Sequence, residues 1–281
     1  MVADGRDRRQ DLGRLRAMCA NDGSRLELLE AAFELGALHR DQPIDLAPFR
    51  QHVAAMAADV ADLARRRGAV PERLAEVIAN SYGYRGDSET YDDLRNADLA
   101  CVIERRKGLP VALSILYLHV ARAQGWESEG LAFPAHFLIR VTIDGPRYVV
   151  DPFHGGAVRD AGELRTLLRQ LLGPEAELQL GHFDAVADRD VLLRLENNVR
   201  LRLARQEDWS GAARSLDRML AIAPDRPELL FESGEINARL DKRGAAIAAF
   251  GRFLAIEGGQ ADPALRRRAS ELLQELRRGL N

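Results

Sequence analysis

Residues 96–141 read NADLACVIERRKGLPVALSILYLHVARAQGWESEGLAFPAHFLIRV, and they contain the change from helix to strand on which the predicted fold class rests. Apolar residues recur at helical spacing until Lys107-Gly108, and a second helix is predicted from Pro110 to Gly125. That second helix is apolar nearly all round, which is typical of a helix at the centre of a domain. Strand-forming residues follow from Leu131 onward.

The strands continue beyond this stretch. Asp144-Gly145 lies between two β-rich runs and predicts a hairpin. Helical spacing covers about 26–80 before the strands and resumes at about 160. The sequence therefore predicts a mostly helical α+β fold with a small antiparallel sheet in the middle. The expected strands are 131–133, 137–143 and 147–150.

Composition excludes several classes of protein. Forty basic side chains stand against 43 acidic ones, so the formal net charge is −3 and no basic field is available for nucleic acid. No apolar run is long enough to cross a membrane. The two cysteines, Cys19 and Cys101, form no metal-ligand spacing, and no cofactor or metal is expected. We expect a cytoplasmic protein that binds neither nucleic acid nor membrane.

The last third of the chain repeats itself with a period of 34 residues. Ala212, Leu216 and Met219 recur as Ala246, Phe250 and Phe253. Gly234 and Pro224 fall where a tetratricopeptide repeat places its glycine and terminal proline. We expect repeats at about 193–226 and 227–260, followed by a capping helix at 262–280. Plain amphipathic helical hairpins would give a similar pattern.

His136 and Asp151 form the most suggestive pair of polar residues. His136 lies near the start of one predicted strand, and Asp151 lies at the end of the strand that pairs with it. A hydrogen bond between them would fix the imidazole tautomer and raise its basicity, as a general base requires. A structural pair that closes the end of the sheet would look the same.

A family resemblance rests on four motifs: ERRKGLP, the helix ending in RAQG, PAHFLIR and DPFHGG. With the repeats after them, they resemble the transglutaminase-like superfamily and, more narrowly, its SirB family of bacterial proteins. The resemblance implies a papain-like core with a Cys–His–Asp triad for acyl transfer or peptide hydrolysis. His136 and Asp151 match two members of that triad.

The third member of the triad is missing. Counting back from Gly125 places Pro110 where the family pattern has its cysteine, and a proline ring has no nucleophilic atom. Cys101 is the nearest thiol, in an apolar context typical of a packing residue. Ser114 lies one helical turn beyond Pro110, where serines usually bond back to a backbone carbonyl.

Five further residues are candidates for a binding role. Glu104 and Arg105 end a helix, where they would either line a pocket or form a solvated end. His154 follows Asp151 and is expected to be an exposed loop residue. Tyr82 and Tyr84 belong to the polar segment 81–96, a predicted long loop in which they would cover the site or anchor the loop.

These observations divide the chain into an N-terminal helical segment (1–80), a transglutaminase-like core (81–185) and a repeat domain (186–281). We expect a non-catalytic scaffold or regulator that binds a peptide or protein partner. Two alternatives remain open: an amidase, peptidase or acyl transferase that uses His136 and Asp151, and a protein in which that pair is only structural.

Overall fold

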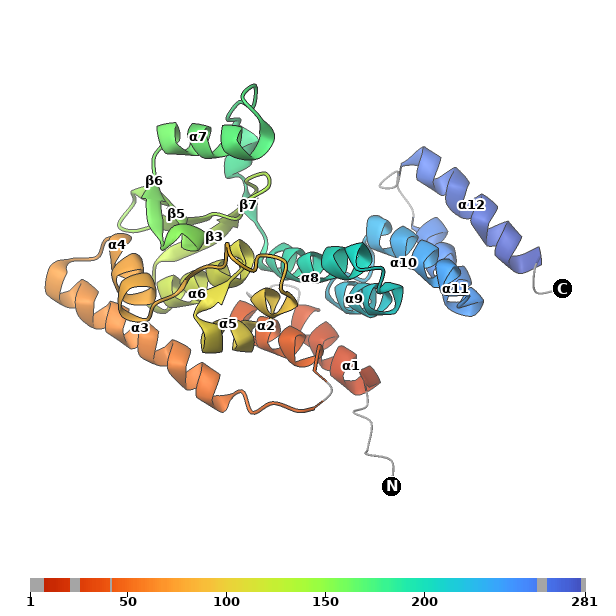
Figure 1. Cartoon of the computed structure of the whole chain (residues 1–281), viewed down its shortest axis with the longest axis horizontal. Helices are drawn as coiled ribbons and strands as arrows, with labels where there is room; N and C mark the ends of the chain where they lie inside the picture. Colours follow the sequence, from red (N-terminus) through yellow and green to blue (C-terminus); the bar gives the residue numbers. More distant parts are fainter. Residues whose placement is uncertain (1–7, 21–25, 41, 257–261, 279–281) are drawn as a thin grey trace. The chain divides into compact units, whose positions relative to one another are not determined.

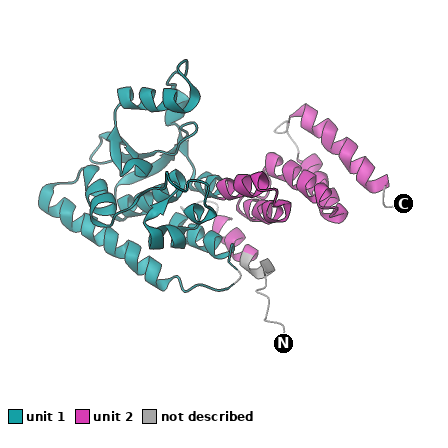
Figure 2. Cartoon of the chain, viewed as in Figure 1, with its two compact units in different colours: residues 1–6, 23–195 teal, residues 7–22, 196–281 magenta. Residues whose placement is uncertain are grey.

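The computed structural model describes residues 8–20, 26–40, 42–256 and 262–278 (Figure 1). The chain forms two compact units (Figure 2). One unit contains residues 23–195 together with 1–6, and the other contains residues 7–22 together with 196–281.

Helix α6 (Pro110–Ala123) is the centre of the first unit. Pro110 opens it at a position where the missing N–H costs nothing, and nearly every side chain along it is buried. The predicted central helix is therefore confirmed. Other helices of this unit pack around α6, among them α2, α3 and α5. The helices of the unit ahead of α6 are α2 (Leu28–Ala37), α3 (Ala47–Arg67), α4 (Glu72–Leu74), the π-helix η1 (Ala75–Ser81), the 3-10 helix η2 (Leu94–Ala97) and α5 (Leu99–Arg105).

An antiparallel sheet of five strands follows α6, with the order β6-β5-β4-β3-β7. The hairpin between β4 and β5 turns at Asp144 (φ 50°) and Gly145 (φ 103°), as the sequence predicts for Asp-Gly. Its register pairs Ile139 with Val150. A separate pair of two-residue strands, β1 and β2, runs parallel. The strands are β1 (Arg85–Gly86), β2 (Lys107–Gly108), β3 (Glu127–Leu131), β4 (Ile139–Thr142), β5 (Arg147–Asp151), β6 (Ala157–Arg159) and β7 (Ala185–Val186).

Helix α7 (Ala161–Leu172) packs through Leu164 and Leu168 against residues of the sheet region. The partners are Leu131, Phe133 and Leu138, all fully or almost fully buried. The 3-10 helix η3 (Pro152–His154) follows β5 and packs on α6, and a further 3-10 helix, η4 (Leu180–Phe183), precedes β7. The sheet region is thus held between α6 and α7, and the end of β5 is fixed in place.

The second unit is helical. It contains most of α8 (Asp188–Arg205), then α9 (Trp209–Ile222), α10 (Pro227–Arg239), α11 (Arg243–Ala255) and α12 (Pro263–Arg278). The six residues that repeat at a period of 34 are all buried, as expected for the contact faces of paired helices. A Cβ built on Gly234 would lie 2.5 Å from the ring of Phe250, so a glycine is needed where the two helices approach.

The compact units do not follow the segments 1–80, 81–185 and 186–281. Helices α2 and α3 pack on α6 and belong to the same unit as the sheet, whereas α1 (Arg8–Cys19) packs on α9 in the other unit. Among the side chains of α1 whose burial is described, those of residues 12–19, Leu15 and Cys19 are buried. Within the described residues, no helix is both long and apolar enough to span a membrane.

Candidate functional site

The end of β5 and the turn before β4 bring His136 and Asp151 together. The imidazole Nε2 of His136 donates a hydrogen bond of 2.9 Å to Oδ1 of Asp151, the bond expected from the sequence. Asp151 is fully buried, and His136 is 7% exposed. The backbone here is held from α8, because the Arg194 guanidinium donates to the carbonyl of His136 at 2.6 Å. Ala135, just before His136, has a φ of 58°.

His154 is the third member of this cluster, although the sequence predicts only an exposed loop residue at this position. The turn of η3 brings its ring back to Asp151, and Nδ1 donates to Oδ2 at 2.7 Å. Its backbone N–H lies 3.3 Å from Oδ1, and a guanidinium nitrogen of Arg159 lies 3.4 Å from Oδ2. The Asp151-Pro152 pair favours the start of a turn and is the one sequence signal that points to this arrangement.

Asp151 is ionised in this setting. Its burial by itself would raise the pKa, but the hydrogen bond from His136 and the positive potential of both histidines outweigh burial and lower the pKa to about 2. One buried carboxylate therefore orients two imidazoles. The half-exposed ring of His154 faces solvent, while the ring of His136 lies deeper.

Aromatic rings form a wall beside the histidines. The rings of His136 and Phe153 meet edge to face, with centroids 5.9 Å apart, and Tyr91 meets Phe153 in the same way at 6.1 Å. Gly86 leaves room for this wall, because a Cβ there would lie 2.5 Å from the Phe153 ring. Tyr91 is 42% exposed and belongs to the loop that the sequence analysis singled out.

Tyr82 and Tyr84, the tyrosines named in advance for that loop, make other contacts. Tyr82 donates to Asp59 on α3 at 2.7 Å. Tyr84 is buried against His52 and Arg106, and its burial raises its pKa to about 12. Both tyrosines anchor the loop to the helices and do not cover the site. The loop residue whose ring lies beside the site is Tyr91.

The position expected for the nucleophile is occupied by Pro110, and the nearest possible replacements are Ser114 and Cys101. Pro110 is buried in the first turn of α6. The Ser114 hydroxyl donates back to the Pro110 carbonyl at 2.8 Å, as helix serines usually do. Cys101 is partly exposed rather than buried in apolar surroundings, and the Arg40 guanidinium donates to its Sγ at 3.1 Å. Burial, followed by the charge of Asp98, raises the pKa of this thiol and disfavours a thiolate.

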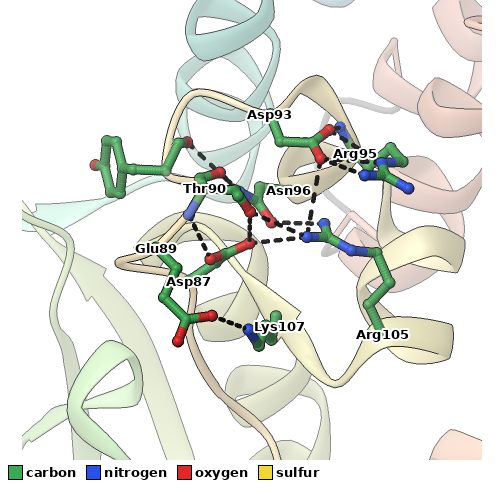
Figure 3. A network of polar contacts seen from close by, with 9 residues as sticks. Asp87, Glu89, Thr90, Asp93, Arg95, Asn96, Arg105 and Lys107 are labelled. Carbon is green, nitrogen blue, oxygen red and sulfur yellow. Dashed lines mark hydrogen bonds and ion pairs between the residues drawn. The ribbon is translucent and has the colours of Figure 1, made fainter.

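A polar network fixes the loop that carries Tyr91 (Figure 3). Arg105 donates to Asp87 at 2.8 Å and to Asn96 at 2.8 Å, and Thr90 donates to Asp87 at 2.6 Å. Burial would raise the pKa of Asp87, but these hydrogen bonds prevail and hold it well below its usual value. Arg105 is thus a structural anchor. Glu104, beside it, is exposed, and its charge contributes to the raised pKa of the nearby Cys101 thiol.

Comparison with known proteins agrees with this architecture. The transglutaminase-like superfamily matches residues 47–197, and a tetratricopeptide repeat family matches residues 199–274. A UPF0162 protein of Xylella fastidiosa is 37% identical over 190 residues, which are 66% of this chain and 68% of that protein. A UPF0162 protein of Vibrio cholerae is 30% identical over 250 residues, 88% of this chain and 92% of the relative. Protein SirB1 of Salmonella typhimurium is 24% identical over 187 residues, 65% and 69% of the two chains.

Proposed function

Because this chain belongs to the SirB branch of the transglutaminase-like superfamily, we propose that it is a non-catalytic module that binds a peptide or protein partner. The observation that carries the proposal is Pro110 in the first turn of α6, where the family pattern has its nucleophile. Cys101 and Ser114 do not replace it, since their described hydrogen bonds involve Arg40 and a backbone carbonyl.

The surroundings of the His–Asp pair favour a peptide as the bound partner. Tyr91 and His154 are exposed beside Phe153 and offer aromatic and imidazole surface, which suits side chains and amide groups alike. The repeat unit supports the same function, because helical repeats build extended surfaces that receive other chains. An adaptor or regulatory scaffold follows from these two features.

A display experiment tests this proposal. A random peptide library is selected on the full chain, and the enriched peptides are incubated with it and weighed by mass spectrometry. We expect selective binding that Tyr91→Ala weakens about ten-fold, with every peptide recovered at unchanged mass. The matched control is Tyr148→Ala, a tyrosine of the same sheet region outside the aromatic wall. Failure to enrich any peptide, or equal losses in both variants, would overturn the binding function.

One observation favours an enzyme as the second candidate. The His136–Asp151 hydrogen bond is intact, and it leaves the Nδ1 atom of His136 as the ring nitrogen that could accept a proton. In that case the displayed peptides would be cleaved, deamidated or cross-linked by the wild-type chain and left intact by His136→Ala. Thiol- and serine-directed electrophiles would then label Cys101 or Ser114 only when His136 is present.

A further inference from the structure

His136, Asp151 and His154 place three metal-binding groups at one point of the first unit. One donor atom from each residue can be chosen so that all three lie within 4.8 Å of one another. The closest approaches are the 2.9 Å between His136 Nε2 and Asp151 and the 2.7 Å between His154 Nδ1 and Asp151. No metal is expected from the sequence, because the cysteines show no metal-ligand spacing and the contact of His154 with Asp151 forms only in the folded chain.

The backbone holds these donors in place on both sides. Asp151 and His154 are linked by the single turn of η3, which Gly155 closes with a φ of 70°. On the other side, His136 follows Ala135, whose φ of 58° is uncommon for a residue with a side chain. Strained backbone of this kind persists where the surrounding structure imposes it, and it clusters at functional sites.

We propose that His136, Asp151 and His154 bind a divalent transition-metal ion, for which Zn²⁺ is the probe. Two imidazole nitrogens and one carboxylate oxygen are the donor set of open zinc sites, which keep a fourth position for a further ligand. Nitrogen donors do not suit Mg²⁺ or Ca²⁺, whose ligands are oxygens. The exposed side of His154 supplies the route by which the ion enters.

Binding replaces two hydrogen bonds by metal–ligand bonds. Each imidazole now donates an N–H to Asp151, so metal binding through that nitrogen requires the other neutral tautomer: the ring loses this proton and takes one up on its second nitrogen, with no net change in its charge. The Tyr117 hydroxyl lies beside the same turn, where a Cβ on Gly156 would be 2.7 Å away. It is buried and has no hydrogen-bond partner among the described residues, as is common where an ion or its water completes a site.

Arg159 is the feature that opposes the ion. One of its guanidinium nitrogens lies 3.4 Å from Asp151 Oδ2, and another lies 3.4 Å from Glu163. Its positive charge competes with a cation for the carboxylate. Removing that charge should therefore change the metal affinity in the opposite direction to removing a ligand. We expect Arg159→Gln to bind the metal more tightly than wild type.

Titration calorimetry of the untagged, chelator-treated full chain with ZnCl₂ tests the site, and Co²⁺ absorption reports its geometry. We expect one ion per chain and a loss of at least about ten-fold in affinity for His154→Ala. His39→Ala removes an exposed histidine elsewhere in the chain and is expected to bind as wild type does. Circular dichroism establishes that each variant is folded; because His154 is half exposed, its replacement leaves the core intact.

Two results would overturn the metal site. One is the absence of saturable binding of one Zn²⁺ per chain by the folded wild type. The other is an equal effect of His154→Ala and His39→Ala, which would place the ion on surface histidines. The experiment uses no peptide, so its failure leaves the proposed binding function standing, and failure of the display experiment leaves the metal site standing.

Discussion

Asp87 is the residue whose replacement gives the clearest stability prediction. Its carboxylate is fully buried and accepts from Arg105 and Thr90, so Asp87→Asn removes the charge that compensates the Arg105 guanidinium. We expect a loss of about 2 kcal/mol in the free energy of unfolding at neutral pH, because hydrogen bonds to a charged group are weakened and the longer contact of Arg105 with Asp93, at 3.9 Å, compensates the guanidinium only in part. Urea denaturation measures the loss.

The loss depends on pH in a defined direction. Because the pKa of Asp87 is lower in the folded chain than in the unfolded one, its contribution is complete above the ordinary aspartate value of about 4 and is lost as the pH falls through the folded value. The difference between wild type and Asp87→Asn should therefore shrink below about pH 4. Asp144→Asn, at an exposed turn, is the control and should change stability by less than about 0.5 kcal/mol at every pH. A difference that grows on acidification would contradict this account.

At this scale the sequence predicted some contacts and missed others for identifiable reasons. The His136–Asp151 hydrogen bond follows from strand pairing, which the hairpin signal at Asp144-Gly145 fixes. The bond from His154 depends on the tightness of the η3 turn, which no periodicity reports. Tyr91 was missed because its neighbour Phe153 comes from a distant segment, and only the folded chain brings the two rings together.

Helix pairs of the repeat unit depend on small residues at their crossing points, and Gly234 is the sharpest case. Gly234→Ala places a methyl group 2.5 Å from the ring of Phe250, which is fully buried and has little room to move. We expect a loss of about 1–3 kcal/mol from overpacking. Gly251→Ala, on α11, meets no atom within 4 Å and should instead stabilise by up to about 1 kcal/mol. Thermal unfolding compares the two; equal shifts would mean that the crossing tolerates a larger residue.

Elements with strong local signals were predictable, and those defined by distant pairing were not. The central helix from Pro110 and the 34-residue repeat needed only spacing, turn residues and composition. By contrast, β1 and β7 are two residues long and exist only because β2 and β3 lie beside them. The long loop predicted at 81–96 accordingly contains one short strand and ends in a 3-10 turn.

At the scale of the whole molecule, the two compact units separate helices that follow one another in the sequence. Helix α1 packs on α9, whereas α2 packs on α6. Amphipathic spacing identifies which face of α1 is apolar but not which element covers that face, so the sequence placed α1 and α2 in one segment. The N-terminal helix is thus part of the structure that supports the repeats.

Leu15→Ala tests this division, because Leu15 is fully buried in α1 and belongs to the second unit. Each unit contains one of the chain's two tryptophans, Trp126 in the first and Trp209 in the second, so Trp126→Phe confines the fluorescence signal to the second unit. In that background we expect Leu15→Ala to lower the stability reported by Trp209 by about 2–5 kcal/mol. Gly13→Ala, an exposed change in the same helix with no atom within 4 Å, should raise it by up to about 1 kcal/mol. The energetic loss appears in the unit from which buried contacts are removed. Helix α1 would therefore belong with the first unit if Leu15→Ala left the Trp209 transition unchanged and shifted the Trp126 transition in a Trp209→Phe background.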